Sequence, residues 1–392
     1  MRAVTWQGRR RIAVQEVPDP RIEEPSDAIV RITSTAICGS DLHLYELLGP
    51  FLDRGDVLGH EAIGVVVETG AQVRDLAPGD RVVVPFTIAC GSCFMCVRGL
   101  QSQCETTQVR QYGAGAQLFG YTKMYGQVPG AQAELLRVPR ADYNTIRVGR
   151  ELPDERYLFL GDILSTAWQG VEYAQLPENG DTLAILGLGP VGQLATTVAV
   201  HRGLRVLAVD PVPERRELAE RHGAEVFDVS DELVAQLQDL TGGRGPDAVV
   251  DAVGMEAHGE PLVGLMQKAA GSLPGSLVRT AVERFGVDRL PALHTAVDLV
   301  RRGGTVSLSG VYAGNADILP MRTIFDKQLT LRGGQCNVKH WTEQLLPLAE
   351  RADDPLRLGE LVTHRTGLEE APRMYEIFQR KAEGCIKVVM TP

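Results

Sequence analysis

Apolar residues follow two different patterns along the chain, and the change between them predicts two kinds of domain. Up to about residue 90, short runs such as AIVRITSTAI and EAIGVVVETG are punctuated by Gly and Pro, a pattern typical of strands in a partly open β-barrel. From about residue 163, short buried strands such as TLAILGLG and LRVLAVD alternate with helices such as VGQLATTVAVHRG. Strands separated by helices predict βαβ units, and therefore an α/β domain built on a doubly wound parallel sheet.

The 392 residues exceed what one hydrophobic core usually serves, so two domains are expected. We expect the first to comprise residues 1–162 and 335–392, since the tail resumes a mixed pattern and ends in the strand CIKVVM. Residues 163–334 form the predicted second domain. Extra material at about 255–290 is interpreted as a partly helical insertion near the cofactor cleft.

Composition narrows the class of protein. Apolar residues make up 44% of the chain and charged residues 23%, with a formal net charge of −10. This acidic balance argues against a general nucleic-acid or membrane-surface binder, both of which use a basic face. No apolar run approaches a membrane span, and the N-terminus has no apolar signal-peptide core. We therefore expect a soluble cytoplasmic protein.

Four of the seven cysteines lie in one short stretch, CGSCFMCVRGLQSQC. The spacing C-x2-C-x2-C-x7-C lets a compact lobe, at about 88–106, present four thiolates to one tetrahedral zinc ion. The predicted ligands of this structural zinc are Cys90, Cys93, Cys96 and Cys104. Clustered thiols in a reducing compartment are more often metal ligands than disulfides. Cys336 and Cys385 stand alone and are interpreted as small apolar or incidental residues.

A glycine-rich turn, GLGPVG, follows a predicted strand and opens a predicted helix. In this context G-x-G-x-x-G indicates a dinucleotide-binding loop. Gly187 permits the tight turn, Gly189 lets the backbone approach the pyrophosphate, and Gly192 allows close packing of helix on strand. Pro190 and Val191 begin the helix, whose positive end would hold the pyrophosphate.

An acidic residue, Asp210, ends the next predicted strand. Its carboxylate would accept hydrogen bonds from the adenosine ribose and would repel a 2′-phosphate, which favours NAD over NADP. Pro211 follows, rather than an arginine that could pair with a phosphate. Arg215 and Arg216 are close in sequence, and either they belong to a solvated helix face or Arg215 contacts the cofactor.

A second set of metal-binding residue types lies on glycine-flanked turns between apolar strands. Cys38 begins CGSDLH, and His60 lies in GHE. A catalytic zinc needs about three protein ligands and one open position. Asp162, which opens a helix at the domain junction, is the candidate third ligand, although taken alone it is better explained as a helix N-cap. Glu61 would either bind zinc in exchange with water or support the site from outside it.

Together these motifs resemble those of the zinc-containing medium-chain alcohol dehydrogenases, over essentially the whole chain. The matching features are CGSDLH, GHE, the four-cysteine lobe, Asp162 before its helix, and GLGPVG with Asp210. The resemblance implies a GroES-like catalytic domain, a Rossmann domain, two zinc ions per chain and hydride transfer between an alcohol and NAD. Within the superfamily the chain is similar to the branch of glutathione-independent formaldehyde dehydrogenases and threonine dehydrogenases. An aspartate replaces the usual third cysteine ligand in the formaldehyde branch, which supports Asp162.

The resemblance also implies roles for residues near these motifs. Ser40 would hold the substrate hydroxyl, and His43 would complete a proton relay to solvent. Asp41 would orient the ligand His60, and Thr166 would contact the cofactor. Family analogy implies a homodimer or homotetramer.

Three alternatives remain open at this point. One is a formaldehyde dehydrogenase or aldehyde dismutase that keeps its NAD bound, with the 255–290 segment covering the adenosine. A second is a non-catalytic zinc-binding interaction module, which predicts that substitution of Cys38 or His60 leaves function intact. The third is a zinc-free quinone reductase of the same superfamily, which the two metal-ligand sets argue against.

Overall fold

The computed structural model describes residues 1–176, 181–254, 290–312 and 319–392. The chain divides into two compact units. Unit 1 comprises Met1–Ser165 and Cys336–Pro392, and unit 2 comprises Thr166–Gln335. The insertion predicted at about 255–290 lies outside the described residues except for its last position, Leu290, so it stays a prediction.

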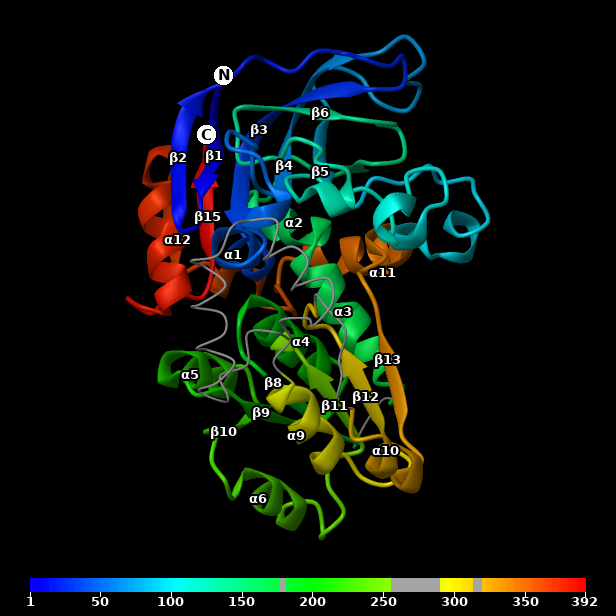
Figure 1. The fold of residues 1–392 in the computed structure, drawn as a ribbon, viewed down its shortest axis with the longest axis vertical. Coiled ribbons are helices and arrows are strands. Elements are labelled where there is room, and N and C mark those ends of the chain that lie inside the picture. Colours follow the sequence, from blue (N-terminus) through cyan, green and yellow to red (C-terminus); the bar gives the residue numbers. More distant parts are fainter. Residues whose placement is uncertain (177–180, 255–289, 313–318) are drawn as a thin grey trace. The chain divides into compact units, whose positions relative to one another are not determined.

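Unit 1 is built on a seven-stranded, mainly antiparallel sheet (Figure 1). Its strands run in the order β14-β15-β3-β4-β5-β7, and β6 pairs with β3. Their bounds are β3 (Ala28–Ile37), β4 (Glu61–Thr69), β5 (Arg81–Val84), β6 (Leu135–Val138), β7 (Ile146–Arg147), β14 (His364–Gly367) and β15 (Val388–Thr391). The end strands β14 and β7 do not pair with each other within this fully described unit, so the sheet is open. A separate antiparallel hairpin is formed by β1 (Arg2–Gly8) and β2 (Arg11–Glu16).

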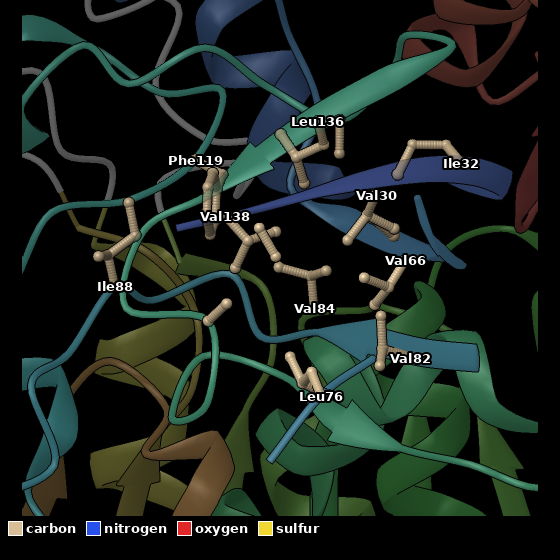
Figure 2. Packing of buried hydrophobic residues seen from close by; sticks show 14 residues of the cluster. Val30, Ile32, Val66, Leu76, Val82, Val84, Ile88, Phe119, Leu136 and Val138 are labelled. Carbon is tan, nitrogen blue, oxygen red and sulfur yellow. The ribbon is translucent and has the colours of Figure 1, made fainter. Parts of the chain in front are cut away.

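The strands of this sheet contribute side chains to a buried hydrophobic core. Val66 on β4 is 1% exposed, and its neighbour Val67 is 41% exposed. Figure 2 shows Val66 packed with Val30, Val82 and other side chains from β3, β5 and β6. Because successive side chains of a strand point to opposite faces, Val66 lies in the core and Val67 faces away from it.

Helices and short 3-10 turns complete unit 1. The α-helices are α1 (Gly39–Glu46), α2 (Glu155–Leu158), α3 (Ile163–Tyr173, which continues into unit 2), α11 (Val338–Glu350) and α12 (Ala371–Arg380). The 3-10 turns are η1 (Gly49–Phe51), η2 (Cys96–Arg98), η3 (Gln101–Gln103), η4 (Arg110–Tyr112), η5 (Lys123–Tyr125), η6 (Phe159–Gly161), η8 (Leu358–Glu360) and η9 (Leu368–Glu370). Helix α12 lies beside β2 (Figure 1) and buries Met374, Tyr375, Ile377 and Phe378. This spacing of three and four residues is that of one helix face.

Unit 2 contains a six-stranded parallel sheet in the order β10-β9-β8-β11-β12-β13. The strands are β8 (Thr182–Leu186), β9 (Arg205–Val209), β10 (Glu225–Phe227), β11 (Ala248–Asp251), β12 (Thr305–Leu308) and β13 (Thr330–Gly333). Besides the end of α3, the α-helices among the described residues of this unit are α4 (Pro190–His201), α5 (Pro213–Arg221), α6 (Leu233–Asp239), α9 (Pro291–Leu299) and α10 (Met321–Lys327). The order reverses between β8 and β11, where doubly wound sheets bind dinucleotides. This confirms the predicted doubly wound α/β sheet.

None of the helices within the described ranges is long and apolar enough to span a membrane.

The alternation on β4 yields a test of the core. We expect Val66→Ala to lower the free energy of unfolding by about 2 kcal/mol, because it removes buried methyl groups and leaves a cavity. The matched control Val67→Ala should change it by less than about 0.5 kcal/mol, since that side chain faces outward. Urea denaturation of the two variants measures both values. Equal losses would contradict the assigned faces of the strand.

Candidate metal centres and nucleotide-binding loop

Four potential metal ligands meet inside unit 1. Cys38, His60, Glu61 and Asp162 are all buried, and each offers one ligand atom within 4.8 Å of the others. Cys38 directly follows β3, and His60 and Glu61 stand at the start of β4. Because Ala36 pairs with Glu61 in the antiparallel register, these ends of the two strands coincide.

Asp162 reaches the group from the turn that follows η6. The amide of Phe86 donates to the carbonyl of Gly161 (3.0 Å), which ties this turn to the end of β5. A Cβ atom at Gly161 would lie 2.8 Å from the carbonyl oxygen of Val84. Glycine at this position therefore allows the turn to approach the strand closely and to place the next residue, Asp162, in the group.

His60 is held on both sides of its ring. Nε2 lies 3.1 Å from Asp162 Oδ2 and 3.2 Å from Ser40 Oγ. Nδ1 lies 3.3 Å from Asp41 Oδ1. Burial acts to lower the pKa of His60, but the nearby carboxylates of Asp41 and Asp162 outweigh it and raise that pKa well above its usual value. The ring thus turns Nε2 toward the candidate ligands and Nδ1 away from them.

The donor set fits a zinc ion. Thiol, imidazole and carboxylate are the three side-chain types that zinc sites combine. Burial and the neighbouring Asp162 raise the pKa of the Cys38 thiol to about 11, so a nearby cation is needed to favour the thiolate that binds metals. Glu61 Oε2 is buried and has no hydrogen-bond partner in the described part of the chain. A divalent cation would offset these buried negative charges.

Sequence reasoning missed the cation that already lies beside this group. Lys387 is fully buried, and its Nζ donates to Glu61 Oε1 (2.5 Å) and to the carbonyl of Ile37 (3.0 Å). Burial acts to lower the pKa of Lys387, and the Glu61 carboxylate outweighs it, so that pKa is raised. The signal was present in CIKVVM, where one lysine interrupts an apolar strand.

Ser40, Asp41 and His43 lie on α1, which begins directly after Cys38. Asp41 Oδ2 accepts a hydrogen bond from the Cys38 amide (2.9 Å), so the helix start holds the carboxylate in place. Ser40 is half-buried, and His43 is buried one turn further along. The structure therefore brings Ser40 and Asp41 into contact with the group, includes Glu61 in it, and places His43 on the same short helix as Ser40 and Asp41.

The four-cysteine lobe forms the second candidate metal centre. Cys90, Cys93, Cys96 and Cys104 offer sulfur atoms that all lie within 4.8 Å of one another. The measured pairs are Cys90–Cys96 at 4.0 Å and Cys93–Cys104 at 3.9 Å. Four sulfurs placed about 2.3 Å from a tetrahedral zinc ion would be about 3.8 Å apart, so the spacing fits zinc.

Backbone amides and hydroxyl groups donate hydrogen bonds to the cysteine sulfur atoms of this lobe, which stabilises their negatively charged thiolate form. The amide of Cys93 donates to Cys90 Sγ, and that of Cys90 to Cys104 Sγ, both at 3.3 Å. Burial opposes ionisation of Cys90, but hydrogen bonds from the Thr106 hydroxyl and from backbone amides lower the pKa of its thiol to about 5. Burial raises the pKa of Cys96 instead. A bound cation would favour the thiolate form at both positions.

The motif GGQCNVKHW, which has no obvious role in the sequence, braces the lobe. Asn337 Oδ1 accepts hydrogen bonds from the amide and the hydroxyl of Ser102, both at 3.0 Å. Lys339 Nζ donates to the carbonyl of Thr145 (2.8 Å). His340 lies so close to Gly99 that a Cβ there would be 2.5 Å from its Nδ1. These contacts explain three of the polar residues in the motif.

The glycine-rich loop in unit 2 has the geometry that its sequence predicts. Gly187 has φ +86°, and a Cβ at Gly192 would lie 1.8 Å from the carbonyl oxygen of Gly187. Gly189 is the N-cap of α4, which begins at Pro190, and Val191 is half-buried. The loop therefore requires glycine at both positions and leads directly into the N-terminus of α4.

Asp210 is buried beside this loop. Its Oδ2 accepts from the Leu188 amide (2.7 Å) and its Oδ1 from the Val212 amide (2.8 Å). Arg215 is also buried, with Nη1 3.7 Å from Asp210 Oδ2, so it does not belong to a solvated face. Arg216 donates to the Asp210 carbonyl (2.7 Å). Thr166 is half-buried on α3, and its contact with cofactor stays a prediction.

Comparison with known proteins places these features in a family. Residues 24–148 match the alcohol dehydrogenase GroES-like domain, and residues 190–274 match the zinc-binding dehydrogenase domain. The chain is 39% identical, over the full length of both proteins, to an uncharacterised zinc-type alcohol dehydrogenase-like protein of Bacillus subtilis. A glutathione-independent formaldehyde dehydrogenase of Pseudomonas aeruginosa is 35% identical over 78% of this chain and 80% of its own.

A solved structure agrees with this assignment. The alcohol dehydrogenase TADH from Thermus sp. ATN1 superimposes with a TM-score of 0.79 and 38% identity, covering 100% of this chain and 99% of its own. The comparisons confirm the predicted resemblance and the predicted fold class, a GroES-like domain with a Rossmann domain.

The buried Glu61–Lys387 pair yields a stability test. We expect Lys387→Met to lower the free energy of unfolding by about 3–5 kcal/mol, because it leaves the Glu61 carboxylate buried without its cation. Adding Glu61→Gln to that variant should restore at least half of the loss, since the uncompensated charge is then gone. Urea denaturation at neutral pH measures all three proteins. A double variant no more stable than Lys387→Met would show that the lysine acts mainly through packing.

Proposed function

The chain belongs to the zinc-type alcohol dehydrogenase family, and on this premise we propose that it catalyses the reversible, NAD-dependent oxidation of a small alcohol or hydrated aldehyde. The products would be an aldehyde, a ketone or, from a hydrated aldehyde, a carboxylic acid. The observation that carries the proposal is the buried group of Cys38, His60 and Asp162 with Ser40 beside it. A binding module would have no need to bury a thiol, an imidazole and a carboxylate within 4.8 Å of one another.

We propose Cys38, His60 and Asp162 as the ligands of the catalytic zinc. When bound, zinc supplies a Lewis acid that lowers the pKa of a substrate hydroxyl toward neutrality. Three protein ligands leave one position for that hydroxyl. Glu61 supports the site, and Lys387 offsets its charge. Of the two roles considered for Glu61, the ion pair with Lys387 supports the one in which the carboxylate stays outside the ligand set.

The protein's own residues then orient the substrate and move its proton. Ser40 Oγ, 3.2 Å from His60 Nε2, is placed to accept the proton of the substrate hydroxyl. His43, one turn later on α1, carries that proton toward solvent. Asp41 holds the His60 ring in the orientation that presents Nε2.

We propose that the four-cysteine lobe holds a structural zinc. Four thiolates complete a tetrahedral zinc site and leave no position for a substrate. The hydrogen bonds of Asn337 with Ser102, and the close approach of His340 to Gly99, hold the lobe against the rest of unit 1.

Unit 1 is proposed as the catalytic domain and unit 2 as the NAD-binding domain. When bound to unit 2, NAD would supply the hydride acceptor for the reaction. The loop residues Gly187–Gly192 would hold its pyrophosphate, and Asp210 its adenosine ribose, with Arg215 and Thr166 as further contacts. The Asp210 carboxylate supports NAD over NADP, because a 2′-phosphate would meet its negative charge.

Family analogy supports a homodimer or homotetramer, and the clustered thiols support a reducing compartment such as the cytoplasm. The small-molecule alcohol is the proposed partner, with neither nucleic acid nor membrane involved.

A second candidate is a formaldehyde dehydrogenase or aldehyde dismutase that retains its NAD. The observation that favours it is Asp162, a carboxylate in the metal group, together with the similarity to the Pseudomonas formaldehyde dehydrogenase. Turnover of an aldehyde without added NAD would support this candidate.

The proposed activity is tested by NADH production from zinc-loaded protein. The substrates are primary and secondary alcohols, hydrated formaldehyde and L-threonine, each with and without added NAD. We expect turnover of at least one substrate, and a loss of more than about 100-fold in kcat/KM in Cys38→Ser, because a catalytic zinc ligand is removed. Cys385→Ala, which removes a buried thiol outside the metal groups, should retain activity. Full activity of Cys38→Ser would contradict the proposal.

Cofactor choice is tested at Asp210. We expect Asp210→Ser to raise KM for NAD about tenfold, because a charged hydrogen-bond acceptor for the ribose is lost. The ratio of kcat/KM for NADP to that for NAD should rise as well, since the repulsive charge is gone. Asp228→Ala removes an exposed carboxylate that pairs with Arg216 and serves as the control. An unchanged ratio would contradict the role of Asp210.

A further inference from the structure

A chain of buried side chains connects helix α12 to the imidazole of His60. The Tyr375 hydroxyl donates to Gln132 Oε1 (2.8 Å), and both residues are fully buried. Gln132 Nε2 donates to the carbonyl of Ala36 (3.1 Å) and lies 3.4 Å from Asp41 Oδ2. Asp41 in turn faces His60 Nδ1. Residues more than 200 positions apart thus meet behind the metal group.

The orientation of the Gln132 amide follows from its partners. A carbonyl oxygen only accepts hydrogen bonds, so the nitrogen of the amide must face Ala36. The oxygen then faces Tyr375, whose hydroxyl is the group that can donate to it. Burial raises the pKa of Tyr375 well above its usual value, so the phenol keeps the proton that it donates. The Ala36 carbonyl and the Tyr375 hydroxyl thus hold the amide from both ends, in the orientation that directs N–H groups, and not an oxygen, toward Asp41.

The backbone of Gln132 is tied to the segment that carries His60. Its amide donates to the carbonyl of Leu58 (2.9 Å), and the amide of Ala131 donates to the carbonyl of Gly59 (2.8 Å). Gly59 has φ +91°, and a Cβ there would lie 2.3 Å from Gln132 Cγ. This close approach leaves the glutamine side chain little freedom to move.

Asp41 depends on such support because its contact with His60 is not an aligned hydrogen bond. Oδ1 and Nδ1 lie 3.3 Å apart, and neither has a hydrogen-bond partner in the described ranges. The other oxygen, Oδ2, is held by the Cys38 amide and lies next to Gln132. The position of Oδ2 therefore fixes how well Oδ1 meets the imidazole.

We propose that Gln132 and Tyr375 are positioning residues for the catalytic metal centre. Tyr375 orients Gln132, Gln132 holds Asp41, and Asp41 holds the ring that presents Nε2 to zinc. This inference rests on the proposed function, which places zinc at Cys38, His60 and Asp162. Residues outside the ligand set commonly change metal affinity by about 10–100-fold when substituted.

The test compares zinc release from four proteins, with release from the four-cysteine lobe as an internal reference. The variants are Tyr375→Phe, Gln132→Met and the double variant, and Tyr45→Phe is the control. The Tyr45 ring packs against that of Tyr375, with centroids 5.6 Å apart, and carries no bond to Gln132. Zinc release is followed over time with a colorimetric zinc chelator. The kinetic phase of release that is lost in Cys38→Ser is assigned to the catalytic site.

We expect Tyr375→Phe and Gln132→Met each to speed zinc release from the catalytic site by about tenfold and to leave release from the lobe unchanged. The double variant should release zinc no faster than Gln132→Met alone, because the tyrosine acts through the glutamine. Cobalt-substituted protein provides a second readout, since the ligand-field bands of the one-thiolate site should shift in both variants and not in Tyr45→Phe.

Three results would overturn the inference: Tyr375→Phe releasing zinc like Tyr45→Phe, equal acceleration at both metal sites, or additive effects in the double variant. The second of these would indicate general loosening of unit 1. A fourth result, in which the wild-type protein binds only one zinc ion per chain and binds it in the four-cysteine lobe, would bear on the proposed function instead. It would overturn the proposed catalytic zinc itself, and the inference would fall with it.

Discussion

The antiparallel register of β3 against β4 is the constraint on which the candidate chemistry depends. Pairing of Ala36 with Glu61 sets Cys38 and His60 at the same end of the two strands, although 22 residues separate them in sequence. A slip of one residue would turn every side chain of a strand to the opposite face. The buried face that includes Val66 resists such a slip, so the hydrophobic core of unit 1 also fixes the metal group.

The same end of the sheet must balance charge without water. Cys38, Glu61 and Asp162 are buried acids or potential anions, and Lys387 is the fully buried cation that meets one of them. Lys387 precedes β15, which pairs with β3, so the third strand of this region delivers the counter-charge. The Lys387–Glu61 ion pair alone does not offset the negative charge of the whole group. A divalent metal ion would supply the remaining positive charge. The same buried charged groups therefore determine both the stability of this region and its ability to bind a metal ion.

The sequence predicted the parts of the site that depend on local spacing. The four cysteines and the glycines of GLGPVG act over a few residues, and their spacing alone implies their geometry. Cys38 and His60 were grouped from their residue types on glycine-flanked turns. The family resemblance supported Asp162 as the third ligand, because on its own it is better explained as a helix cap. Lys387, Asn337, Gln132 and Tyr375 were missed, since each acts on a partner far away in sequence. A lysine inside an apolar strand was the only local signal among them.

The central claim is that two zinc ions occupy two different donor sets in unit 1. Anomalous diffraction from crystals of zinc-loaded protein, recorded on both sides of the zinc absorption edge, tests it most directly. The account predicts two peaks per chain, one among Cys90, Cys93, Cys96 and Cys104 and one among Cys38, His60 and Asp162. A single peak at the four-cysteine lobe, in protein given excess zinc, would contradict it.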